Sequence, residues 1–167
     1  AAESCLERYY ERLREKLQGL AGSGAAIEDE VLELYIHLVD VLSVKAGMGN
    51  RLCAAYAAGD KAALKEIAEK EIPSCMEKIK EYKRCREEIW DSESKIFGYE
   101  VLDIRLGGLL SRMETAQRRL KNYLTGRLDK LPELEEARLP YRPVKDGEEH
   151  KLCSCNSWRM IVSASPV

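Results

Sequence analysis

Two adjacent carboxylates, Asp29 and Glu30, are the first residues whose types could support chemistry. A glycosidase or another general acid–base enzyme requires two positioned carboxylates. This pair, however, stands at the predicted start of a helix, where acidic side chains stabilise the positive end of the helix dipole. An acidic pair by itself is weak evidence for catalysis, so we interpret it as a structural feature and assign it no catalytic role.

Histidines and cysteines are the other candidates for nucleophilic catalysis or metal binding. His37 is predicted in mid-helix four residues after Glu33, and no second Glu–His pair exists to complete a di-iron bundle. Cys153 and Cys155 lie near His150, but their spacing is a poor match to zinc ligands. We therefore predict six reduced structural thiols, no metal and no cofactor, and reduced thiols indicate a cytoplasmic location.

The composition restricts the class of protein. The chain has 167 residues, of which 45% are hydrophobic and 34% charged, so it is long enough to form a core without disulfides or metals. Its net charge of −2 lacks the basic excess of a nucleic-acid-binding module. No apolar run approaches the roughly 20 residues that a membrane-spanning helix needs, and the first residues are too charged for a signal peptide. We predict neither a nucleic-acid nor a membrane partner.

Hydrophobic periodicity predicts a bundle of four or five helices. Gly59 and Asp60 mark one boundary as C-cap and N-cap, and Pro73 predicts a break or a kink between the third and fourth helices. Trp90, near the end of the fourth helix, is expected to pack against the fifth helix or the loop before it. The predicted helices cover residues 3–20, 27–58, 61–70, 74–90 and 100–124, with a short helical turn over 132–137.

The C-terminal residues differ in character from the rest. Residues 140–157 contain proline, glycine and charges and are predicted to be irregular, whereas 158–165 alternate apolar and polar residues as one short strand does. No second strand is predicted, and a lone strand leaves backbone groups unpaired. We therefore expect an all-α domain over 1–139 and a tail over 140–167 whose strand pairs outside the bundle.

The predicted fifth helix contains adjacent glycines, Gly107 and Gly108, shortly after Asp103 and Arg105. A glycine inside a helix costs about 1 kcal/mol relative to alanine, so the pair needs an explanation. Missing side chains allow another backbone to approach closely, and buried charges need partners. We predict a packing joint, in which Ile104 can face the bundle while the two charged residues pair within the bundle or across an interface.

Three segments carry a resemblance to a known family. They are residues 40–68, the stretch 97–136 that begins "FGYEVLDIRLGGL", and the tail sequence "NSWRMIVSASP". Together they resemble the C-terminal helical domain of bacterial β-N-acetylhexosaminidases of glycoside hydrolase family 20. The resemblance implies that catalysis belongs to a preceding (β/α)8 barrel, where an adjacent Asp-Glu pair assists attack by the substrate's own acetamido oxygen. Asp29 and Glu30 lack that context and cannot take over these roles.

The resemblance also implies partners and site residues. This chain would be a non-catalytic domain that packs on the barrel or on a second subunit, so a homodimer is one expected arrangement. Five residues are then expected at the interface or at the rim of the sugar site: Asp103, Arg105, Gly107, Gly108 and Trp158. Two alternatives remain open, a free-standing helical interaction module and an isolated chain that still binds amino sugars.

Overall fold

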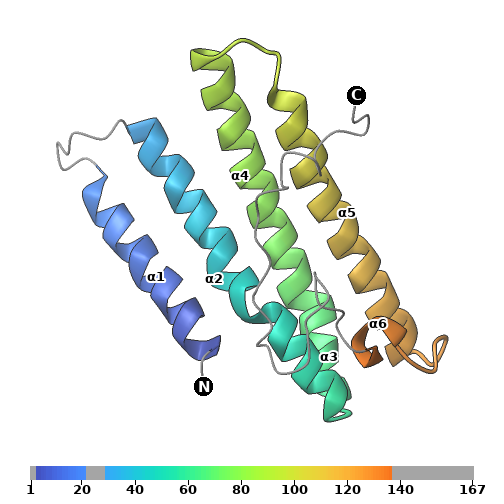
Figure 1. Cartoon of the computed structure of the whole chain (residues 1–167). Coiled ribbons are helices and arrows are strands. Elements are labelled where there is room, and N and C mark those ends of the chain that lie inside the picture. Colours follow the sequence, from blue (N-terminus) through green and yellow to red (C-terminus); the bar gives the residue numbers. More distant parts are fainter. Residues whose placement is uncertain (1–2, 22–28, 137–167) are drawn as a thin grey trace, which may run out of the picture. The chain divides into compact units, whose positions relative to one another are not determined.

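The computed structural model of the chain describes residues 3–21 and 29–136, and every regular element in these ranges is helical (Figure 1). The prediction of an all-α bundle is therefore confirmed, whereas the predicted strand lies outside the described residues. The elements are α1 (Glu3–Leu20), α2 (Asp29–Ala57), α3 (Lys61–Glu66), a π turn η1 (Ile67–Glu71), α4 (Ile72–Glu93), α5 (Tyr99–Leu124) and α6 (Pro132–Glu135).

The chain separates into two units, Ala1–Leu131 and Pro132–Val167. The domain boundary that the sequence predicts between residues 139 and 140 lies outside the described residues and stays a prediction. Of the second unit, the structure describes α6 and the residue that follows it. The first unit contains α1 to α5.

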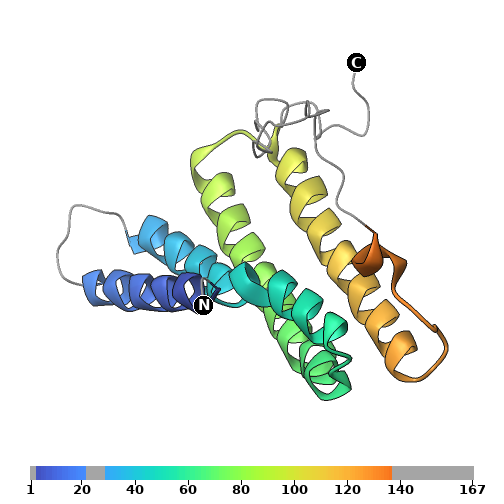
Figure 2. The same cartoon turned by 60° about the horizontal axis from the view of Figure 1, so that its bottom comes forward.

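Within the first unit, α1, α2, α4 and α5 lie side by side in that order (Figures 1 and 2). Helix α1 packs on α2, α2 packs on α4, and α4 packs on α5. The C-terminal ends of α2 and α5 come together where the rings of Tyr56 and Tyr123 lie 5.3 Å apart. The Tyr56 hydroxyl also accepts a hydrogen bond of 3.0 Å from the backbone N–H of Leu131. Among the described residues, α1 and α4 flank α2 on two sides, and α3 and the π turn also contact α2.

Of the two outcomes predicted at Pro73, a break is not found. Helix α3 passes through the π turn directly into α4, so one continuous helix runs from Lys61 to Glu93. Proline lacks the N–H that a regular helical turn requires, and its ring crowds the preceding turn. The π turn comes just before it, with the Ile72 N–H bonded to the carbonyl of Ile67, five residues back. This wider turn is the local change that lets the helix continue past proline.

The boundary at Gly59 and Asp60 is confirmed. Gly59 has a positive φ of 67°, and the Asp60 carboxylate accepts hydrogen bonds of 3.1 and 3.0 Å from the N–H groups of Ala62 and Ala63. A side-chain acceptor at this position satisfies N–H groups that have no partner in the first helical turn. This cap fixes the start of the continuous helix.

The core follows the continuous helix. Its largest fully buried side chains are Leu64, Cys75, Ile79, Leu120 and Leu131. Cys85 forms a second apolar cluster with Leu34 and Ile89. Burial raises the pKa of the Cys75 and Cys85 thiols above its ordinary value, which keeps them protonated and unreactive. These two cysteines therefore act as packing residues.

Ion pairs hold α1 and α2 together on one open side of the layer. Arg51 of α2 pairs with Glu7 of α1 and, at 2.6 Å, with Glu71 of the π turn. Asp40 of α2 lies 3.0 Å from Arg14 of α1 and 3.5 Å from Lys78 of α4. Most of these side chains are largely shielded from solvent, which strengthens their attraction relative to fully exposed pairs.

Gly47 makes room for one of these pairs. A Cβ atom at this position would lie 2.6 Å from the Glu7 carboxylate oxygen Oε1 and 2.8 Å from Arg51 Nη1. Gly49, two residues on, has open space where its side chain would be. The sequence alone does not distinguish these two glycines, but the structure gives a role to one of them.

The two glycines of α2 should therefore respond differently to alanine. We expect Gly49→Ala to raise the free energy of unfolding by about 0.5–1 kcal/mol, the ordinary gain for an exposed helix position. Gly47→Ala should show no gain or a loss, because the new methyl group displaces the Glu7–Arg51 pair. Urea denaturation measures both changes. In a Glu7→Ala background Gly47→Ala should recover its gain; equal gains for both glycines in the unaltered chain would contradict this assignment.

Candidate functional site

The connection between α4 and α5 is held in a defined conformation. The Trp90 indole N–H donates a hydrogen bond of 2.8 Å to the carbonyl of Lys95, and its ring lies 5.8 Å from that of Tyr99. Gly98 has a φ of 104° and donates its N–H to the Glu100 carboxylate at 2.7 Å. The predicted packing of Trp90 is thus confirmed, and it fixes the loop from one side.

This fixed loop presents two large apolar side chains to solvent. Ile96 is 73% exposed and Phe97 is 84% exposed. Scattered apolar residues are normal on protein surfaces, but two neighbours on an anchored loop are typical of a contact site, because little conformational entropy is lost when a partner binds. Both residues fall in the predicted loop between the fourth and fifth helices, where no role was assigned to them. The sequence feature that indicates a role is the pair of large apolar residues in an otherwise polar connection.

Asp103 pairs within the bundle, which is one of the two predicted arrangements, whereas Ile104 differs from expectation. The Asp103 side chain is half exposed and lies 2.7 Å from the ammonium group of Lys83 on α4, so it is an ion-paired surface residue and not a buried charge. Ile104 was expected to face the bundle, but it is 48% exposed. The reason is that α5 packs on α4 with its other side, where Met113 and Leu120 are buried. Arg105 is half-buried and interacts with other groups of the chain.

Gly107 and Gly108 have no close neighbour among the described residues. A Cβ atom added at either position would meet nothing within 4 Å. The packing joint predicted for them is therefore not found in the described part of the bundle. Both lie within one helical turn of Ile104, on its side of α5. We use the term "α5 surface" for the outward-facing set that the loop and this part of the helix form: Ile96, Phe97, Ile104, Gly107 and Gly108.

Trp158, the fifth residue expected at the interface, lies outside the described residues. The other four lie on a single helix, α5. They are therefore close together because they are neighbours in the sequence, and not because folding joins distant segments. Asp103 provides a polar border to the α5 surface through its ion pair with Lys83. The combination of an apolar centre and a polar border is the usual composition of a protein–protein interface.

The other candidates from the sequence lie where structural roles account for them. Asp29 and Glu30 occupy the first turn of α2, as predicted. His37 lies 3.6 Å from the carboxylate of Glu33, one turn earlier in the same helix. Within residues 3–21 and 29–136, no group of three or more His, Cys, Asp and Glu side chains is arranged to hold a metal ion.

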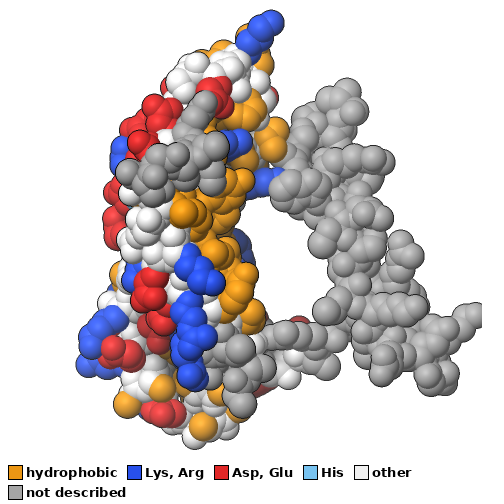
Figure 3. Space-filling view, turned by 90° about the vertical axis from the view of Figure 1, so that its left-hand side faces the viewer, with side chains coloured by type: hydrophobic (Ala, Val, Ile, Leu, Met, Phe, Trp, Pro, Cys, Tyr) orange, Lys and Arg blue, Asp and Glu red, His pale blue; other side chains and the backbone are white. Residues whose placement is uncertain are grey.

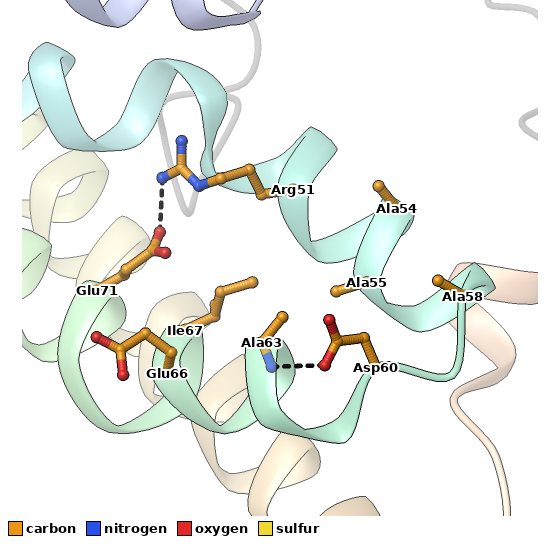
Figure 4. Close-up of a pocket in the computed structure, with 9 residues that line it drawn as sticks. All are labelled: Arg51, Ala54, Ala55, Ala58, Asp60, Ala63, Glu66, Ile67 and Glu71. Atoms are coloured by element: carbon orange, nitrogen blue, oxygen red, sulfur yellow. Dashed lines mark hydrogen bonds and ion pairs between the residues drawn. The ribbon is translucent and has the colours of Figure 1, made fainter.

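A pocket of about 400 Å³ lies between the end of α2 and the start of the continuous helix (Figure 4). Alanines form much of its wall, and Arg51 points across it to Glu71. Its carboxylates have structural partners: Asp60 caps α3, Glu66 pairs with Lys70 at 2.9 Å, and Glu71 pairs with Arg51. The charged groups of this pocket therefore stabilise the local fold. The full lining is Arg51, Ala54, Ala55, Ala58, Asp60, Ala63, Glu66, Ile67 and Glu71.

Comparison with protein families decides the assignment. Residues 1–154 match the family described as the glycoside hydrolase 20C C-terminal domain. The chain belongs to this family. No curated protein matches it closely enough to add an individual relative. None of the described helices of this glycoside hydrolase 20C C-terminal domain is both long and apolar enough to cross a membrane.

The ionisation of the Tyr99 hydroxyl, next to this loop, can be measured. Its hydroxyl donates a hydrogen bond of 3.1 Å to the carbonyl of Lys83, and burial, together with the charges of Glu87 and Asp103, raises its pKa to about 12. In the unfolded chain a tyrosine titrates near 10. The neutral hydroxyl therefore stabilises the fold fully below about pH 10, and this contribution is lost as the pH rises through 12.

Ultraviolet titration of tyrosinate should resolve this group. The native domain should show a tyrosine that ionises near pH 12, and Tyr99→Phe should remove that phase and no other. In urea all tyrosines should ionise together near pH 10. If Tyr99→Phe instead removed a phase near pH 10 from the native protein, the burial of this hydroxyl would be disproved.

The adjacent glycines of α5 provide a second test. Gly107→Ala and Gly108→Ala should each raise the free energy of unfolding of the 167-residue chain by about 0.5–1 kcal/mol, because the methyl group meets open space. Gly126→Ala is the contrasting variant: it should destabilise the chain, since Gly126 has a φ of 76° that alanine adopts poorly. A loss of stability on Gly107→Ala or Gly108→Ala would show that these positions are packed inside the bundle after all.

Proposed function

We propose that this chain is the non-catalytic C-terminal helical domain of a bacterial, cytoplasmic β-N-acetylhexosaminidase, and that it packs on the catalytic barrel through the α5 surface. The observation that carries the proposal is the anchored loop, which exposes Ile96 and Phe97 beside two glycines that face open space. Membership of the glycoside hydrolase 20C C-terminal domain family makes a catalytic domain of the same enzyme the expected partner.

The physical features of the α5 surface suit a domain interface. Phe97 and Ile96 provide large apolar area on a loop that Trp90 already holds in place, so docking requires little ordering. Gly107 and Gly108 let a partner backbone approach α5 more closely than any other residue type would. Two glycines are unfavourable in an isolated helix, so a close contact outside this chain explains a sequence choice that the bundle itself does not.

The distribution of carboxylates supports a non-catalytic role. Glu7, Asp40 and Glu71 pair with basic side chains, and Asp60 caps a helix. Catalysis in this proposal belongs to the barrel, whose Asp-Glu pair works with the substrate's acetamido group. Asp103 and Arg105 lie where the domain would border the barrel, so they are the residues here that we place nearest the rim of the sugar site.

Two alternatives make different predictions. In a homodimer, the α5 surface would contact a second subunit, and its loss would change the oligomeric state of the enzyme. A free-standing interaction module would have no barrel partner, and the gene upstream of this chain would encode none. Buried, protonated Cys75 and Cys85 are compatible with the reducing cytoplasm in either case.

A comparison of the full-length enzyme with the 167-residue chain tests the proposal. Phe97→Ser and Ile104→Ser should lower the melting temperature of the full-length enzyme by several degrees, because each exposes apolar surface of the barrel that the wild-type side chain covers. The same variants should leave the melting temperature of the isolated chain within about a degree, since both side chains are already solvent-exposed there.

Activity measurements complete this test. The isolated chain should not hydrolyse a chromogenic β-N-acetylglucosaminide above the blank, whereas the full-length enzyme should. Hydrolysis by the isolated chain that disappears on mutation of one of its carboxylates would overturn the non-catalytic role. Identical effects of Phe97→Ser on the full-length enzyme and on the isolated chain would show that the α5 surface does not meet the barrel.

A further inference from the structure

The two sides of α2 that neither α1 nor α4 flanks differ in chemistry. Asp40, Gly47 and Arg51 are separated by seven and four positions and share the side that carries the ion pairs. The opposite side carries apolar residues at the same helical spacing. They are Val31, Tyr35, Leu38 and Leu42, of which Tyr35 is 51% exposed and the others are half-buried.

Helix α1 continues this division. Glu7 and Arg14 form its ion pairs with α2, which places them on the ionic side. At roughly 100° per residue, Tyr9 and Leu20 lie almost opposite to Glu7 on the helix. Around the helix, Leu6 and Leu13 lie between the side of Tyr9 and Leu20 and the side that packs on α2. Leu6 is 50% exposed, Tyr9 57% and Leu20 39%.

Together these residues form one apolar surface, which we call the α1–α2 face: Leu6, Tyr9, Leu13, Leu20, Val31, Tyr35, Leu38 and Leu42. Figure 3 shows a band of apolar side chains with Lys and Arg side chains next to it, and most of the visible Asp and Glu side chains lie farther from the band. From residue 6 to residue 20, no side chain of α1 is fully buried. An amphipathic helix that buries none of its apolar side chains completely is typical of an element that awaits a partner.

The charges around the α1–α2 face are basic. Arg12 and Lys16 follow Tyr9 by three and seven positions and therefore share its side of α1. On α2, Lys45 follows Leu42 by three positions and Leu38 by seven, so it shares their side of the helix. The acidic side chains Glu7 and Asp40 are on the opposite, ionic side. A partner for this face should therefore combine apolar residues with a rim of Asp and Glu.

We propose that the α1–α2 face docks an outer helix of the catalytic barrel that carries apolar residues flanked by Asp and Glu. This rests on the proposed function, because it takes the barrel as the partner, and it adds a second contact beside the α5 surface. Helices α1 and α2 run antiparallel (Figure 1). A third helix can pack on their shared apolar side by ordinary ridge-and-groove packing. A second copy of this chain is disfavoured as occupant, since face-to-face pairing would bring basic rims together.

The face is prepared for binding by the ion pairs on the other side. Arg51 and Asp40 form ion pairs with α1 on the opposite side, so the α1–α2 face keeps its form without a partner. Docking then requires little rearrangement of the backbone, and the binding free energy is not spent on ordering α1. This gives the ionic side of α2 a purpose beyond the stability of the isolated domain.

Charge reversal on the rim tests the proposal in the full-length enzyme. In the unaltered enzyme, amides of residues 6–20 should exchange with solvent at least tenfold more slowly than in the isolated chain. Arg12→Glu combined with Lys16→Glu should abolish most of this difference and should leave exchange in the isolated chain unchanged. The matched control is Lys61→Glu with Lys65→Glu, two exposed residues of α3 outside the face, which should have no effect on α1 exchange.

The outcomes separate this inference from the proposed function. If residues 96–108 are protected in the full-length enzyme while residues 6–20 exchange as in the isolated chain, the barrel docks on the α5 surface alone and this inference fails. If neither segment gains protection, both fail. If the charge reversal converts a dimer of the isolated chain to a monomer in light scattering, a second copy occupies the face and the inference is wrong.

Discussion

The arrangement of this domain depends on one constraint, the continuity of the helix from Lys61 to Glu93 past Pro73. A break at Pro73 would let α3 turn away from α4 and would separate the residues that form the core. The π turn from Ile67 to Glu71 avoids this by shifting the hydrogen-bond partners ahead of proline. Leu64, Cys75 and Ile79 then lie on a single helix, against which both α2 and α5 pack.

The same turn also places Glu71 beside Arg51. This contact links the π turn to α2, and the Glu7–Arg51 pair links α2 to α1, so a local change in helix geometry extends its influence to the N-terminal helix. Gly47 is necessary for this, because a side chain there would occupy the position of the paired groups. Electrostatics of this kind contribute modestly to stability, but they fix which side of α1 meets α2.

A layer of helices leaves more surface open than a closed bundle does. Here the open surfaces are chemically distinct: one side of α1 and α2 is ionic, the other is apolar with a basic rim, and α5 presents exposed apolar residues next to glycines. Such differentiation is expected of a domain that works as part of a larger enzyme. The family assignment identifies the domain, and these surfaces are the basis of the contacts that we propose for it.

The sequence by itself determined the helical class, most helix boundaries, the cap at Asp60 and the family, because these depend on local periodicity, capping chemistry and a contiguous motif. Tertiary structure alone decided the continuity past Pro73, the exposure of Ile104, and which glycines are crowded. Gly47 and Gly107 look alike in sequence, yet one faces an ion pair and the other faces open space. The physical reason is that helical periodicity places residues on a side of a helix, whereas the neighbouring helix decides which side is covered.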